Sequence, residues 1–140
     1  MKSAVVDASV AAKWVVEEAD TDKAVLLLSY DALHAPDHWL AEASNVLWAK
    51  VVRSEMDAAD AEERMAILLR APVTGSPISR LLPRAFAISL ARQITIYDSL
   101  YVTLAETLDV AMVTADIRLV RRVAPDTALA SRMVLLRDLG

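Results

Sequence analysis

The stretch SAVVD, residues Ser3–Asp7, decides the fold class of this chain of 140 residues. It is a short apolar run rich in Val and bounded by polar residues, which is typical of a strand buried on both faces. A helix capped by Ser9 is expected to follow and to run to about Glu18. A buried strand that leads straight into a helix is the unit from which parallel sheets are built.

The same alternation continues along the rest of the chain. Further strands are expected at Leu33–Ala35, Val73–Thr74, Val110–Thr114 and Met133–Leu136. Helices are expected at Lys23–Tyr30, from a cap at Asp37 to Arg53, from Asp57 to Arg70, from a first turn with Pro83 to Arg92, and at Tyr97–Leu108 and Ile117–Val123. Together these elements predict one α/β domain over residues 1–140, with three α/β/α layers and a central, mainly parallel sheet.

The composition excludes several classes of protein. The chain has no cysteine, so it can form neither a disulfide framework nor a thiolate metal site. It has only two glycines, and neither lies in the phosphate-binding pattern of a P-loop or a dinucleotide fold. The chain has neither the apolar core of a signal peptide nor a bilayer-spanning apolar run. We therefore expect a cytoplasmic protein without membrane association.

Two carboxylates follow the two clearest strands. Asp7 comes directly after the first strand, and Asp116 comes two residues after Val110–Thr114. In open α/β sheets, sites form outside the carboxyl ends of the strands. If the two strands are neighbours, both carboxylates should face one crevice.

Two further carboxylates lie on helices, next to side chains that should face the core. Glu42 comes three residues after Trp39, and Asp98 comes three residues before Tyr101. A buried carboxylate is costly unless a positive charge or hydrogen bonds offset its desolvation. If all four acids converge, the cluster requires a cation.

Each acid also has a simpler explanation: Asp98 and Asp116 could cap helices, Asp7 could belong to a turn, and Glu42 could be solvated. If the four converge, an all-oxygen site suits Mg²⁺ or Mn²⁺. Such ions promote phosphodiester hydrolysis by stabilising the attacking and leaving oxygens.

Four segments carry a resemblance to a known family. They are VVDASVAAKWVVEE (Val5–Glu18), PDHWLAEASNVLWA (Pro36–Ala49), IYDSLYVTLAE (Ile96–Glu106) and VTADIRLVRR (Val113–Arg122). Their sequence and order resemble the PIN-domain nucleases and, more narrowly, the VapC-type toxins of bacterial type II toxin–antitoxin pairs. The similarity spans nearly the whole chain.

The resemblance implies an endoribonuclease that depends on Mg²⁺ (or Mn²⁺), forms a homodimer and is inhibited by a cognate antitoxin protein, in a heterotetramer or a larger complex. It also assigns residues. The implied catalytic and metal-binding acids are Asp7, Glu42, Asp98 and Asp116. The polar residues implied to support them are Ser9, Asn45 and Thr114. Ser99 stands where such proteins often have Ala.

Arginine is concentrated in the second half of the chain. Residues 1–70 carry 7 basic and 13 acidic side chains, whereas residues 71–140 carry 8 and 6, and all eight basic ones are arginines. The arginine fork is well suited to phosphate. Arg118, Arg121 and Arg122 follow Asp116 closely, so they are candidates for RNA binding. A solvated surface that happens to use arginine explains the charge pattern equally well.

Other functions fit the residues less well or remain open. A response-regulator receiver needs paired acids after the first strand and a late lysine, but every lysine here precedes residue 51. An aspartyl phosphotransferase needs Asp-x-Asp, but Ala8 and Ser9 follow Asp7. A non-catalytic RNA- or protein-binding module that retains the PIN-like fold stays open as the alternative.

Histidine and tryptophan are given no catalytic role. His34 and His38 flank Pro36, where such residues are more often solvated than catalytic. Trp14 and Trp39 have core spacing. Trp48 lies off that stripe, and we expect it to be exposed, which would suit a partner interface.

Overall fold

The computed structural model describes residues 1–140 and contains one five-stranded sheet in the order β3-β2-β1-β4-β5. All four strand pairs are parallel, as predicted. The central strand β1 (Ser3–Val6) pairs with β2 (Ala32–Pro36) on one side and with β4 (Ala111–Thr114) on the other. The edge strands are β3 (Val73–Ser76) and β5 (Met133–Leu135).

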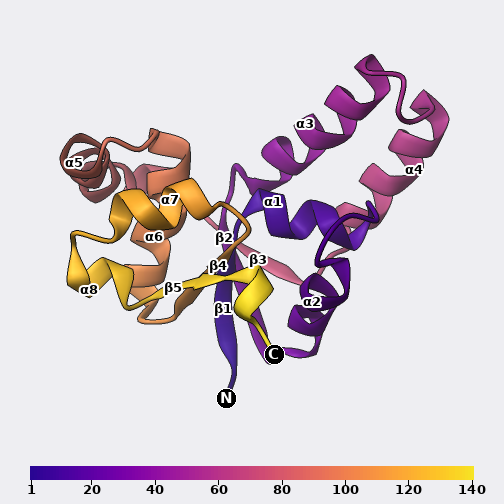
Figure 1. Ribbon diagram of the computed structural model, residues 1–140. Coiled ribbons are helices and arrows are strands. Elements are labelled where there is room, and N and C mark those ends of the chain that lie inside the picture. The colour runs from indigo at the N-terminus through magenta and orange to yellow at the C-terminus, as the bar shows by residue number, and fades with distance from the viewer.

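Helices cover both faces of the sheet, which gives the three predicted layers (Figure 1). α1 (Ala8–Ala11) and α2 (Thr21–Leu26) lie on one side, and α5 (Leu82–Arg92), α6 (Ile96–Leu108), α7 (Ile117–Val123) and α8 (Thr127–Ala130) lie on the other. α3 (Trp39–Val52) and α4 (Ala58–Leu68) form a hairpin that extends beyond the sheet. Short 3₁₀ helices occupy Ala12–Trp14, Leu27–Ser29, Ile78–Arg80 and Leu136–Asp138. No helix has both the length and the apolarity needed to cross a bilayer.

The alternation of side chains along β1 divides the core between the two faces. Ala4 and Val6 pack in one cluster with Leu27, which follows α2. Val5 belongs to the larger cluster, which contains Met112 of β4 and Leu104 of α6. All these side chains are nearly or fully inaccessible to solvent, so β1 is buried on both faces, as its apolar sequence predicts.

The structure corrects several predicted helix boundaries. The first helix is capped by Asp7 rather than Ser9, and its 3₁₀ continuation ends at Trp14 rather than near Glu18. Asp37 does not cap α3; its N–H instead donates to the carbonyl of Ser76 and extends the pairing of β2 with β3. The four-residue helix α8 was not predicted because so short a segment carries no helical period. Leu108, the last residue of α6, is exposed and lies outside the core.

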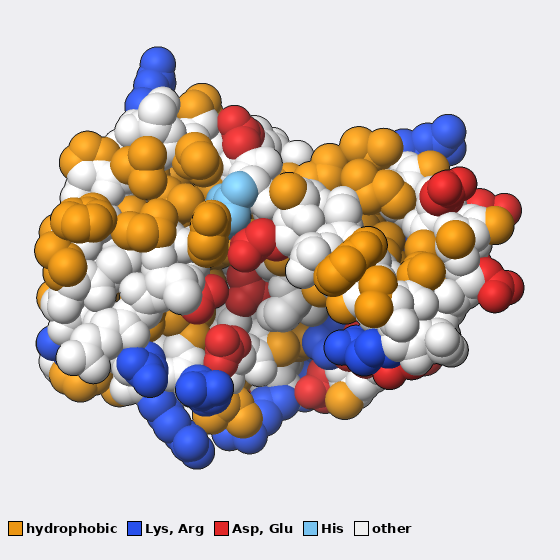
Figure 2. Space-filling view, turned by 90° about the horizontal axis from the view of Figure 1, so that it is seen from above, with side chains coloured by type: hydrophobic (Ala, Val, Ile, Leu, Met, Phe, Trp, Pro, Cys, Tyr) orange, Lys and Arg blue, Asp and Glu red, His pale blue; other side chains and the backbone are white.

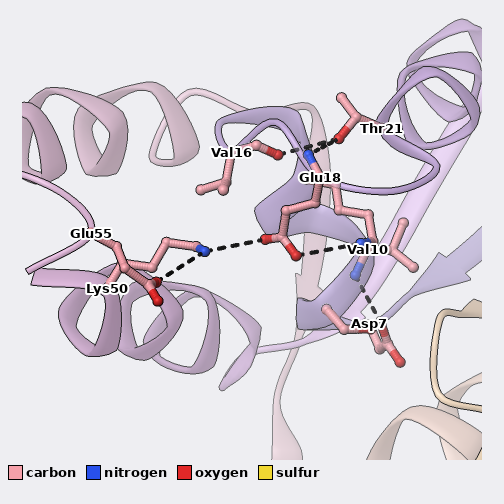
Figure 3. Close-up of polar contacts among 9 residues, drawn as sticks. Asp7, Val10, Val16, Glu18, Thr21, Lys50 and Glu55 are labelled. Atoms are coloured by element: carbon pink, nitrogen blue, oxygen red, sulfur yellow. Dashed lines mark hydrogen bonds and ion pairs between the residues drawn. The ribbon is translucent and has the colours of Figure 1, made fainter. Parts of the chain in front are cut away.

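Ion pairs connect the α3–α4 end of the hairpin, at the last turn of α3, to the segment after α1 (Figure 3). The Nζ atom of Lys50 lies 3.8 Å from Glu18 and 3.7 Å from Glu55. Glu18 also lies 3.8 Å from Nζ of Lys13, and the guanidinium of Arg64 donates to the carbonyl of Val15. These contacts hold the outer part of the hairpin against the segment after α1. The first half of α3 supplies one wall of the site.

Candidate active site

The site lies at the point where the order of the strands reverses. The chain proceeds from β1 outward to β2 and β3, and then returns to the other side of β1 with β4. Loops at the carboxyl ends of β1 and β4 therefore separate in opposite directions and leave a crevice between them. A cavity of about 530 Å³ lies there, and Figure 2 shows acidic side chains along a groove between two lobes of the molecule.

All four acids expected from the sequence line this one cavity. It is lined by 12 residues, none of which is lysine or arginine. The acidic members are Asp7, Glu42, Asp98 and Asp116. They come from four separate segments, so the fold itself brings these carboxylates to one place.

Asp7 is the most deeply buried of the acids, with 8% of its surface exposed. One carboxylate oxygen, Oδ1, accepts hydrogen bonds from the Ser9 hydroxyl at 2.6 Å and from the Val10 N–H at 3.1 Å. The other oxygen accepts one from the hydroxyl of Thr114. Burial nevertheless raises the pKa of Asp7 to about 6, because these bonds offset only part of the desolvation.

Asp116 caps α7 and faces the cavity at the same time. Its Oδ1 accepts from the N–H of Leu119 at 3.1 Å, and its own N–H donates to the Thr114 hydroxyl at 3.0 Å. Thr114 thus connects Asp7 and Asp116 through a single buried hydroxyl group. Capping and facing the site are compatible, because the cap occupies only one of the two carboxylate oxygens.

Asp98 lies in the first turn of α6, whose cap is Thr95. The Thr95 hydroxyl accepts from the Asp98 N–H at 3.1 Å, so the Asp98 carboxylate is not used as the cap. Burial raises the pKa of Asp98, and the negative charges of Asp116 and Glu42 raise it further. These carboxylates are therefore close enough to repel one another.

Glu42 projects from the first turn of α3 and accepts two contacts on the same oxygen. The hydroxyl of Tyr101 donates to Oε1 at 2.7 Å, and Nε2 of His38 lies 3.2 Å from that atom. Burial alone would raise the pKa of Glu42, but the contacts with His38 and Tyr101 outweigh it and leave the pKa lowered. For Tyr101, burial and then the Glu42 charge raise the pKa, so its phenol remains a donor.

Of the three polar residues expected to support the acids, two form hydrogen bonds with a carboxylate and one does not. Ser9 and Thr114 both donate hydrogen bonds to Asp7. Asn45 lines the cavity but makes no hydrogen bond to any carboxylate.

The three candidate arginines also differ in whether they lie next to the acids. Arg118 and Arg122 line an adjoining pocket that shares Asp98 and Asp116 with the main cavity, whereas Arg121 lines neither. Arg122 also donates to the carbonyl of Gln93 at 2.8 Å.

Sequence reasoning missed Tyr101 as a residue of the site. It assigned Tyr101 to the core by its helical spacing, and the side chain is indeed 2% exposed. A buried tyrosine hydroxyl needs a polar partner, and that requirement was the available signal. His38 was set aside as solvated, but its side chain is only 12% exposed and contacts Glu42.

The donor set fits a hard divalent cation. The four acids offer only oxygen ligands, the donor type that Mg²⁺ and Mn²⁺ prefer. Burial raises the pKa of Asp7 and of Asp98, and a bound cation would favour their charged forms. No three acidic or histidine side chains lie close enough together to enclose one ion. Mg²⁺ does not need such a cage, since it keeps several waters and commonly uses one or two carboxylates together with substrate phosphate.

Comparison with known proteins agrees with this geometry. The PIN domain family model matches residues 4–124. Ribonuclease VapC9 of Mycobacterium tuberculosis is 34% identical over 115 residues, which are 82% of this chain and 87% of that protein.

Two crystal structures have a similar fold. PAE2754 from Pyrobaculum aerophilum superposes with a TM-score of 0.72 at 23% identity, covering 99% of this chain and 95% of that one. The Mycobacterium tuberculosis toxin VapC20, described as cleaving the sarcin–ricin loop, gives a TM-score of 0.59 at 18% identity and covers 76% and 83%. By its matched segments and its fold, this chain belongs to the PIN-domain family and, within it, to the VapC ribonucleases.

Proposed function

We propose that this chain is a Mg²⁺- or Mn²⁺-dependent endoribonuclease, that it acts as the toxin of a toxin–antitoxin pair, and that its active site is the cavity of the four acids. One observation carries the proposal: four carboxylates from separate segments line one cavity that contains no lysine or arginine. Such a concentration of negative charge costs stability in the protein alone. It is useful when a cation and a phosphodiester bind there.

One or two of the four carboxylates would hold each cation together with water and substrate phosphate. The cation would stabilise charge on the scissile phosphate and lower the pKa of the attacking water. The protein's own part is to orient these acids. Ser9, Val10 and Thr114 fix the Asp7 carboxylate. Helix capping fixes one oxygen of Asp116 and leaves the other for ligation.

Arg118 and Arg122 are proposed to bind RNA phosphates next to the reacting group. They line the pocket that adjoins Asp98 and Asp116, so a strand that crosses the acids would reach them. Arg118 forms no ion pair within the chain and is the better placed of the two. Arg121 is exposed and lines neither pocket. It therefore has the least structural support of the three as an RNA-binding residue.

The proposed partners are a second copy of the chain and a cognate antitoxin protein, together forming a heterotetramer or a larger complex. Exposed apolar side chains support this proposal. On α5, Leu82, Phe86 and Leu90 are 39%, 57% and 69% exposed at a spacing of four residues. On α3, Trp48 is 62% exposed, as expected from the sequence. Apolar patches on both lobes are visible in Figure 2, and contiguous patches of this kind commonly mark protein interfaces.

A cleavage assay tests the proposed function. Purified protein is incubated with total cellular RNA in Mg²⁺, in Mn²⁺ and with chelator, beside Asp98→Asn and Asp116→Asn. Asp22→Asn, at an exposed residue of α2 that does not line the cavity, is the matched control. We expect metal-dependent cutting by wild type and by Asp22→Asn, with a loss of at least about a hundredfold in the two site variants, a magnitude typical of removing a transition-state contact.

Three results would contradict the proposal. Equal cutting by all variants would mean that the acids are not the active site. Cutting that persists in chelator would remove the metal requirement. Tight RNA binding that is unaffected by Asp98→Asn, without cleavage of any RNA supplied, would favour the non-catalytic binding module.

A further inference from the structure

The contact between Tyr101 and Glu42 joins two helices that are far apart in the sequence. Tyr101 is on α6, which packs on the sheet, and Glu42 is on α3, which begins the projecting hairpin. The phenol hydroxyl donates to Oε1 of Glu42 at 2.7 Å. Of the four acids, Glu42 is the one whose carboxylate accepts a hydrogen bond from a side chain of α6, on the opposite wall of the cavity.

His38 adds a second contact to the same oxygen. Its ring centroid lies 4.9 Å from that of Tyr101 and 5.9 Å from that of Tyr97, so two aromatic side chains hold the imidazole in place. Its Nε2 is 3.2 Å from Oε1 but is not aligned for a regular hydrogen bond, and its Nδ1 has no partner. Tyr101 is therefore the directional donor, and His38 supplies packing and a polar neighbour.

Both contacts fall on Oε1, so the other oxygen of Glu42 has no protein partner. Glu42 and Tyr101 both line the cavity of the acids. A carboxylate held by one oxygen presents the other in a single direction, which reduces the conformational entropy lost when a ligand binds. Polar groups that orient metal ligands in this way commonly change metal affinity by one to two orders of magnitude.

We propose that Tyr101 is a positioning residue for the metal site: its hydroxyl holds Oε1 of Glu42 so that Oε2 is presented to the cation. This proposal rests on the proposed function, because it assumes that the four acids bind a divalent ion. The simpler explanation is that Glu42 merely satisfies a buried tyrosine hydroxyl. The two explanations differ in what happens to metal affinity.

The test measures Mn²⁺ and Mg²⁺ affinity by calorimetry, without RNA, for wild type, Tyr101→Phe, Glu42→Gln and the double variant. Tyr30→Phe is the matched control, because Tyr30 lies near the amino-terminal end of the sheet, away from the acids, and makes no hydrogen bond through its hydroxyl. Melting temperatures in chelator report folding separately. We expect Tyr101→Phe to weaken binding about tenfold and Tyr30→Phe to leave it unchanged.

The double variant identifies the route of the effect. If Tyr101 acts through Glu42, then Tyr101→Phe adds no further loss of affinity to that of Glu42→Gln. An affinity of Tyr101→Phe within twofold of wild type, with only the melting temperature lowered, would overturn the inference and leave the metal site intact. The inference would also be overturned if Tyr101→Phe weakened metal binding equally in wild type and in Glu42→Gln. Absence of metal binding by wild type would overturn the proposed metal site itself, and this inference with it.

Discussion

At the scale of single residues, Asp7 combines deep burial with three hydrogen-bond donors, and the donors do not compensate fully for the loss of water. Its pKa is raised to about 6, from 3.8 for an ordinary aspartate. In the metal-free protein the folded state therefore binds a proton more tightly than the unfolded chain does. An active-site acid that destabilises its own fold is expected where a bound cation is needed to neutralise it.

The sign of this effect can be measured. Because the folded pKa is raised, the contribution of Asp7 to stability is fully present below about pH 4 and is lost as the pH rises through about 6. In chelator, wild type should lose up to about 3 kcal/mol of its free energy of unfolding as the pH rises from about 4 to about 6, and Asp7→Asn should not show this loss. Urea unfolding of wild type and variant at several pH values would check this. Parallel stability curves from pH 4 to pH 7 would show that Asp7 is not the group responsible.

Thr114 offers a second prediction, with a matched control on α6. Its buried hydroxyl donates to Asp7 and accepts from the N–H of Asp116. The equally buried hydroxyl of Thr103 has no partner. Thr114→Val keeps the shape but removes the hydrogen bonds to a buried oxygen of Asp7 and to the part-buried N–H of Asp116, so it should lower the free energy of unfolding by about 2–3 kcal/mol. Thr103→Val should be neutral or slightly stabilising. Equal losses in the two variants, by chemical denaturation, would refute the assigned network.

At the scale of elements, the contact of α5 with α6 includes one buried polar interaction that involves Ser99. Its hydroxyl donates to the carbonyl of Ala85 at 2.6 Å and is fully buried. The nearby hydroxyl of Ser89, on α5, is also buried but has no partner. The two serines therefore differ in hydrogen bonding rather than in chemical type.

Replacing each serine with alanine separates these roles. Ser99→Ala should lower the free energy of unfolding by about 0.5–1 kcal/mol, since the lost hydrogen bond exceeds the gain in helix propensity. Ser89→Ala should raise it by about 0.5 kcal/mol, because only propensity changes. Thermal unfolding of both variants would decide. A more stable Ser99→Ala would mean that the bond to Ala85 contributes nothing.

Elements with strong patterns could be predicted from the sequence, and short ones could not. The strand at Val110–Thr114 and the helix at Ile117–Val123 match β4 and α7 to within one residue, because apolar runs and polar boundaries are both clear there. Helices α5 and α6 end at Gln93 and Asp109, which take left-handed backbone without glycine. The first helix was extended too far because Val15 and Val16 continue the apolar pattern after the backbone has left the helix.

The acids could be predicted because they stand at the ends of strands or next to core stripes. Their contacts could not, because a hydrogen bond such as that of Tyr101 to Glu42 joins residues 59 apart in the chain. The same holds for the adjoining pocket, which Arg118 lines and Arg121 does not. From their spacing in the sequence, the three neighbouring arginines are equally good candidates for RNA binding. Only the orientation of α7 in the structure shows which of them face the pocket.

At the scale of the whole molecule, an acidic chain places two arginines, Arg118 and Arg122, in a pocket next to the acids. The chain carries a net charge of −4, and the groove that is proposed to hold RNA is acidic along its centre (Figure 2). Phosphate must therefore be attracted by a cation in the groove and by arginines at its edge. RNA affinity should depend on both.

The arginine contribution can be isolated by measuring binding at several salt concentrations with the uncleavable background Asp98→Asn. Replacing Arg118 and Arg122 with Gln should weaken RNA binding and reduce the salt slope by about one for each lost phosphate contact. Arg137→Gln, at an exposed arginine near the carboxyl terminus, is the control and should change neither quantity. Unchanged affinity and slope in the Arg118 and Arg122 variants would exclude them from the RNA path.

The central claim is that the four carboxylates form a divalent metal site, and anomalous diffraction from crystals soaked in Mn²⁺ tests it most directly. We predict one or two anomalous peaks in the cavity, each within about 2.3 Å of an oxygen of at least one of Asp7, Glu42, Asp98 and Asp116. In Asp7→Asn crystals grown in the same way, the peaks should weaken or disappear. Full Mn²⁺ occupancy elsewhere on the molecule, with none in the cavity at the same concentration, would contradict the account.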